Sequence, residues 1–189
     1  MKKSYINWNI QRLKTWKECY EYFLDNANNF SIIFQGDPND FGDDGSLLNI
    51  GKKEYLSLHN IKTIKYNGME NSFLVIGELT DEAKALFYKY MSPSFTGGRP
   101  ELWSFEFLSD DDVLMRIDDK NHCIFNLTDN ELKIISSMGI TIDNSYDEPM
   151  ISLRNVSLSE NDIDDHVKLK DISKLIVENL IDQIRKTNK

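Results

Sequence analysis

The chain has 189 residues, of which 40% are hydrophobic and 11% aromatic. This length is enough for one folded domain, and this composition is too apolar for an intrinsically disordered protein. Its net charge of −9 disfavours a nucleic-acid binder, because affinity for phosphates comes from Lys and Arg, and it favours a basic partner. No apolar run approaches the roughly 20 residues of a membrane span, and the first residues lack the apolar core of a signal peptide, so we expect a cytoplasmic protein. Cys19 and Cys123 are too few for a disulfide framework and are expected as reduced, buried thiols.

The acidic residues are concentrated in three stretches. Residues 37–51, 101–119 and 137–165 carry net charges of −4, −6 and −6, whereas the rest of the chain carries +7. None of these stretches contains a phosphate-binding loop, a dinucleotide fingerprint or a nucleophile elbow. We therefore interpret the acid as surface charge.

The first part of the chain predicts a strand, a helix and a second strand. Residues 5–10 alternate in hydrophobicity, and residues 16–24 repeat apolar side chains at the spacing of an amphipathic helix. Thr15 and Glu18 have the spacing of a capping box at the start of that helix. Residues 30–34 are almost continuously apolar, which predicts a central strand.

The middle of the chain predicts a loop, three strands and a helix. Gly, Asp, Asn and Pro are frequent between Gly36 and Gly51, which favours a surface loop. The helix is expected to begin at Thr80-Asp81-Glu82 and to end before residues 92–100, because prolines and adjacent glycines follow there. The three predicted strands are residues 55–58, 61–66 and 72–76.

The next part predicts a strand, a hairpin and a short helix. Trp103, Phe105 and Phe107 alternate with Ser104 and Glu106, so we expect an aromatic core face and an exposed face that carries Glu106. The elements that follow are a hairpin of residues 113–117 and 123–127, a capping box at Thr128–Glu131 and a helix stop at Gly139.

The last part is less regular. Met150–Val156 is weak strand material inside the acidic residues 143–165, which predicts an edge strand followed by a mobile loop. An amphipathic helix is expected over residues 171–184. The pattern as a whole predicts a single α+β domain over residues 1–189, with a mainly antiparallel sheet of five to seven strands and three or four packed helices. A mixed sheet is the alternative.

Two groups of acids suggest a metal site. Residues 37–45 are rich in oxygen ligands, but their spacing lacks the bidentate Glu of a calcium loop. Residues 110–112 could gather with Asp118 and Asp119 at one end of a hairpin, as in metal-dependent hydrolases. Adjacent acids in turns more often face water, so the metal site remains an alternative.

In the absence of a catalytic signature, we predict a non-enzymatic protein without cofactor or metal that binds a basic protein through its acidic surfaces. The most specific hypothesis is a bacterial immunity protein or another inhibitor of a toxin or nuclease. A phage or mobile-element protein that mimics DNA and a metal-dependent hydrolase that uses the clustered aspartates remain open. The residues expected to contact the partner are Asp37, Asp40, Asp43, Asp44, Glu106, Asp110, Asp111, Asp112, Asp118 and Asp119.

Overall fold

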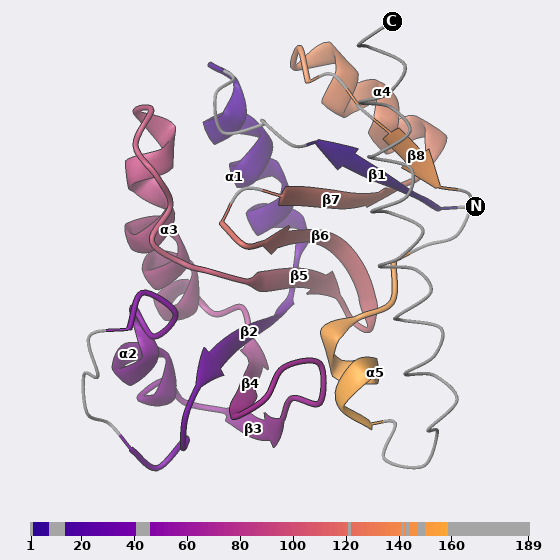
Figure 1. The fold of residues 1–189 in the computed structure, drawn as a ribbon. Helices are drawn as coiled ribbons and strands as arrows, with labels where there is room; N and C mark the ends of the chain where they lie inside the picture. The colour runs from indigo at the N-terminus through magenta and orange to yellow at the C-terminus, as the bar shows by residue number, and fades with distance from the viewer. Residues whose placement is uncertain are drawn as a thin grey trace, which may run out of the picture. The chain divides into compact units, whose positions relative to one another are not determined.

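The computed structural model describes residues 2–7, 14–40, 46–120, 122–140, 142, 144–146 and 150–158 (Figure 1). In this part of the chain there are five helices and one sheet of eight strands. The strands are β1 (Lys3–Asn7), β2 (Asn29–Gln35), β3 (Ile61–Lys65), β4 (Ser72–Glu78), β5 (Phe105–Ser109), β6 (Asp112–Asp118), β7 (His122–Leu127) and β8 (Asn144–Tyr146). The helices are α1 (Trp16–Asn26), α2 (Lys52–Leu56), α3 (Asp81–Phe95), α4 (Asp129–Ser137) and α5 (Leu153–Leu158).

Contacts join residues 1–157 into one compact unit. The second unit, residues 158–189, is described only at Leu158, so the helix predicted over residues 171–184 lies outside the described residues. No helix in the described ranges is long and apolar enough to cross a membrane.

The strands pair in the order β3-β4-β2-β5-β6-β7-β1-β8, and every neighbouring pair is antiparallel. This confirms the predicted α+β class and antiparallel sheet. The eight strands and five helices among the described residues exceed the predicted numbers. Strand β8, which pairs with β1 at the end of the described strand order, has three residues in polar sequence. No hydrophobic alternation predicts it.

Helices α1 to α4 pack on one face of the sheet, where alternate strand residues form an aromatic core. The ring of Phe87 in α3 lies 4.9 Å from that of Phe107 in β5, measured between centroids. Phe23 in α1 stacks on Phe125 in β7 at 5.0 Å. Tyr55 of α2 and Ile135 of α4 belong to the same cluster. The predicted core face of Phe105 and Phe107 is therefore confirmed, since both are 0% exposed.

The opposite face of the sheet is covered by a shorter segment. Leu153, at the start of α5, packs against Ile33 of β2 and Leu74 of β4 in a second, smaller cluster. Trp103, which the alternation places with the aromatic core, precedes β5 and packs in this second cluster instead. Figure 1 shows α5 on the side of the sheet away from α1 and α3.

Two sequence-based assignments in the middle of the chain are wrong. Residues 52–56 form α2, where residues 55–58 were expected as a strand; Tyr55 turns its fully buried ring toward Phe30 and Phe87. Helix α3 continues through Pro93 instead of ending before residue 92. Pro93 has no N–H to donate to the Lys89 carbonyl, as a helical residue at this position normally would. The Ser92 hydroxyl donates to that carbonyl instead, at 2.9 Å.

The two predicted capping boxes have different outcomes. At Thr128 the box is complete, because its hydroxyl accepts from the Glu131 N–H at 3.3 Å and the Glu131 carboxylate accepts from the Thr128 N–H at 2.7 Å. Thr15 makes no side-chain cap, and its ψ of 4° lies outside the extended region that capping requires. The expected edge strand at residues 150–156 is wrong as well, since α5 begins at Leu153.

Candidate functional site

The two aspartate groups of the β5–β6–β7 hairpins lie at opposite ends of β6. Asp110–Asp112 form the turn into β6, whereas Asp118 and Asp119 follow from its other end. A strand of seven residues separates its ends by about 20 Å. The alternative in which these carboxylates gather at one place is therefore wrong. In the described part of the chain, no group of three or more His, Cys, Asp or Glu side chains is arranged to bind a metal ion.

Hydrogen bonds to Asn28 hold the β5–β6 turn, which carries three carboxylates. Asp110 has a left-handed φ of 55°, and its N–H donates to the Asn28 side-chain oxygen at 2.8 Å. The Asn28 amide in turn donates to the Asp110 carboxylate at 2.9 Å. This reciprocal pair fixes the turn against the start of β2. The Asp111 and Asp112 side chains are 102% and 74% exposed, so they face solvent as predicted.

Further exposed carboxylates lie at the same end of the sheet. Since β2 begins there and β4 and β7 end there, the topology brings together the end of α1, the starts of α3 and α4, and the β5–β6 turn. From β4 to β7 this edge spans four strand spacings, about 19 Å. We call its eight exposed acids the acidic rim: Asp25, Glu78, Asp81, Glu82, Asp110, Asp111, Asp112 and Asp129.

Cations neutralise only part of the acidic rim. The ion pairs are Lys2–Asp112 at 3.3 Å, Lys84–Asp25 at 3.7 Å and Arg154–Asp111 at 3.8 Å. Their carboxylates are well exposed, and exposed pairs are worth only about 0–1 kcal/mol. Within the described ranges, the other five rim acids have no ion pair, so the rim has excess negative charge.

Of the other predicted contact residues, Asp37, Asp40, Asp118 and Asp119 lie at the opposite end of the sheet. Asp37 and Asp40 are exposed in the loop after β2, where the Asp37 carboxylate accepts the Asn39 N–H at 2.8 Å. Asp119 is exposed and accepts the Trp103 indole N–H at 3.1 Å. Asp43 and Asp44 lie outside the described residues. The predicted contact residues that are described and exposed are therefore divided between the two ends of the sheet.

Asp118 is partly buried at the end of β6 and is not a free surface acid. Desolvation raises the pKa of Asp118 above 3.8, and the charges of Arg116 and His122 oppose the rise. The Ser104 hydroxyl, which donates to its carboxylate at 3.1 Å, also favours the ionised form. Its environment suits a role within the sheet more than a contact with a partner.

The exposed position predicted for Glu106 is wrong. Its side chain is 0% exposed and forms a 3.0 Å ion pair with Arg116 on the adjacent strand β6. The Ser152 hydroxyl donates to one carboxylate oxygen at 2.6 Å, and the Leu153 N–H lies 3.1 Å from the other. Alternation along β5 identified the correct face, but it gave no sign that residues 46 positions later cover that face.

Residues 150–154 are fixed to the sheet through polar contacts of both their backbone and their side chains. The Asn126 oxygen accepts the Met150 N–H at 3.0 Å, and Arg116 donates to the Ile151 carbonyl. Arg154 donates to the Phe30 carbonyl at 3.1 Å. These bonds, with the Glu106 contacts, show that the polar row across β7, β6, β5 and β2 is used to dock the chain's own segment.

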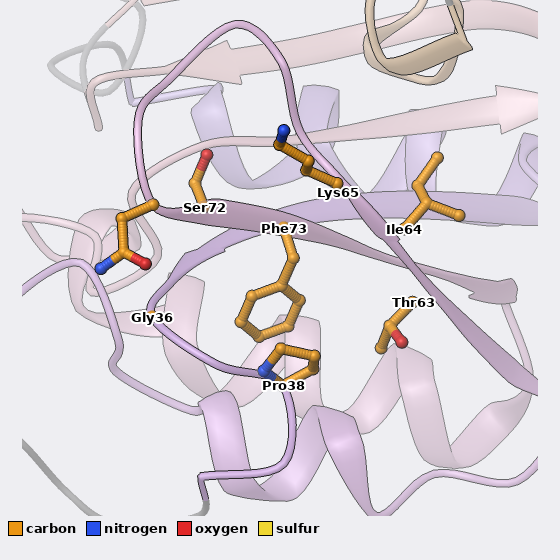
Figure 2. A pocket seen from close by; sticks show the side chains of 8 residues that line it. Gly36, Pro38, Thr63, Ile64, Lys65, Ser72 and Phe73 are labelled. Carbon is orange, nitrogen blue, oxygen red and sulfur yellow. The ribbon is translucent and has the colours of Figure 1, made fainter.

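A hollow of about 300 Å³ lies where β2 ends beside the β3–β4 hairpin (Figure 2). In the picture the Phe73 and Pro38 rings lie next to each other, with Thr63 beside them on the neighbouring strand. The lining residues are Gly36, Pro38, Thr63, Ile64, Lys65, Asn71, Ser72 and Phe73. This lining offers neither a nucleophile paired with a base nor carboxylate ligands for a metal, and it includes none of the predicted contact residues.

The two thiols are not arranged for nucleophilic chemistry. Cys19 and Cys123 are free and buried, as predicted. Burial raises the pKa of Cys19 to about 12 and raises that of Cys123 as well. Because the thiolate is the nucleophile, neither group is activated.

Five of the eight acids of the acidic rim were missed by the sequence analysis. Asp81 and Glu82 were identified only as residues of a helix start, and Asp25, Glu78 and Asp129 carried no signal of their own. Placing them together requires the strand order, because adjacent residues of the rim are up to about 100 positions apart in sequence. Comparison of this chain with family models, curated proteins and solved structures gives no match.

Proposed function

We propose that this chain is a non-enzymatic binding protein that neutralises a basic protein through its acidic rim, in the manner of an immunity protein that inhibits a toxin or nuclease. The observation that supports this is the rim itself, with eight exposed carboxylates at one end of the sheet and three resident cations paired to them. Such a surface accelerates encounter with a cationic partner and repels acidic ones.

The hydrogen bonds that hold parts of the rim support the same function. The turn at Asp110 is fixed by Asn28, and the starts of α3 and α4 are fixed by the Thr80 and Thr128 caps. Charges on such ordered backbone lose little conformational entropy on binding, so more of the interaction energy appears as affinity. A blocking protein requires this kind of surface and needs no catalytic group.

The test compares three forms of the full-length chain as bait in cells of the native host. The first is the wild type, the second carries Asp81→Lys, Asp111→Lys and Asp112→Lys in the rim, and the third carries Asp37→Lys, Asp40→Lys and Asp119→Lys at the opposite end. We expect a basic protein to be recovered by the first and third forms and lost from the second, and its toxic or nuclease activity to be inhibited by the first and third. Equal recovery by all three would contradict the proposal.

A further inference from the structure

A second hollow, of about 440 Å³, lies within the acidic rim where β2 begins beside the end of β4. Its lining residues are Ala27, Asn28, Asn29, Glu78, Leu79 and Thr80. Ala27 and Leu79 are 8% and 7% exposed and supply apolar surface. Glu78 is the one carboxylate of the lining; it is exposed and has no ion pair within the described ranges.

The walls of this rim hollow are fixed by hydrogen bonds between its own segments. The Leu79 N–H donates to the Asn28 carbonyl at 2.8 Å, and the Asn28 N–H donates to the Leu108 carbonyl at 2.9 Å. The Asn29 amide donates to the Asn28 side-chain oxygen at 2.9 Å. Since Asn29 and Glu78 are also paired directly across β2 and β4, the hollow keeps its shape without a ligand.

We propose that the rim hollow receives an arginine side chain of the basic partner, an inference that rests on the proposed function. The apolar stem lies over Ala27 and Leu79, and the guanidinium meets the unpaired Glu78 carboxylate. Arginine fits better than lysine, because its planar fork matches a carboxylate with two parallel N–H donors and is more weakly hydrated. The surrounding rim acids strengthen the attraction, while their exposure makes them sensitive to salt.

The direct experiment is an NMR titration of the full-length chain with N-acetyl-arginine N-methylamide. The matched ligand is the citrulline analogue, which has nearly the same shape and no charge. We expect saturable amide shifts at residues 27–29 and 78–80 with arginine and none with citrulline. Glu78→Gln should weaken arginine binding about tenfold, because one charge-assisted contact is lost. The control Glu82→Gln removes the same charge outside the hollow and should change arginine binding less than about twofold.

Shifts scattered over the rim, equal effects of the two variants, or no saturable shift would overturn the inference. Both substitutions are at exposed positions, so matching thermal midpoints of unfolding will show that both variants are folded. If arginine does not bind, but the rim variant still loses the protein partner, the arginine inference is wrong and the proposed function stands. If arginine binds, but the charge-reversed rim variant recovers the partner as well as the wild type does, the hollow is an arginine site and the proposed function is wrong.

Discussion

Glu106 and Arg116 form a buried ion pair of 3.0 Å between neighbouring strands, and both residues also bind the segment that covers them. The Arg116 Nε atom is buried and has no hydrogen-bond partner among the described residues. Desolvation of two charges offsets much of their attraction, so the pair stabilises the fold only when its remaining hydrogen bonds are made. The pair is therefore best understood together with Ser152 and Leu153 as one network.

Replacing Glu106 with Gln should lower the free energy of unfolding by about 3 kcal/mol, because Arg116 then remains charged and buried without its counterion. Urea denaturation measures this change. The control is Glu70→Gln, at an exposed position, which should stay within about 0.5 kcal/mol of the wild type. Similar stability of the two variants would show that the Glu106 network contributes little.

Removing the Asn126 side chain should loosen residues 150–154 without unfolding the sheet. The Asn126→Ala variant loses the 3.0 Å bond to the Met150 N–H and the 2.8 Å bond from the Ser4 hydroxyl. We expect hydrogen exchange at Met150 to accelerate by about tenfold, since one net hydrogen bond is worth about 1 kcal/mol. Unchanged exchange at Met150 would argue against its fixation by Asn126.

The turn acids should separate into two classes in stability measurements. Asp111→Lys and Asp112→Lys should each change the free energy of unfolding by less than about 1 kcal/mol, because both side chains are well exposed. Asp110→Lys should cost about 1–2 kcal/mol, since it loses the acceptor for Asn28 and places lysine at a left-handed φ of 55°. Equal losses at all three positions in urea denaturation would contradict this division.

The ionisation of Asp118 should reduce stability as the pH rises. Its folded-state pKa is raised above 3.8, chiefly by desolvation, so the folded state binds the proton more tightly than the unfolded state. The stabilising contribution of the protonated form is complete below about 3.8 and is lost as the pH rises through the folded-state pKa. The free energy of unfolding of Asp118→Asn relative to wild type should therefore increase with pH over this window and become constant above it. A flat difference from pH 3 to pH 7 would refute the assignment.

The sequence predicted those elements whose pattern is local. Alternating aromatic residues identified β5, and the spacing of Thr128 and Glu131 identified the start of α4. Tyr55 was assigned to a strand because a short apolar pattern fits a strand as well as a helix. The packing of its ring against Phe30 and Phe87 favours the helix. Local patterns are sufficient where neighbouring residues decide the conformation.

The candidate site depends on contacts that no local pattern contains. Glu106 was placed on the correct face of β5, yet its burial depends on Ser152 and Leu153. The acids at Glu78 and Asp129 join the β5–β6 turn only through the order of the strands. Acidic composition could thus predict the sign of the surface charge, but not which carboxylates share one surface.

The late position of residues 150–154 in the chain has a consequence for its synthesis. Strands β1 to β7 end at Leu127, so a growing polypeptide can assemble most of the sheet before this segment leaves the ribosome. During that interval Glu106 and Arg116 face water, where opposite charges attract weakly. Arrival of the segment excludes the water and strengthens their attraction, so completion of the sheet face is coupled to translation of the residues that close it.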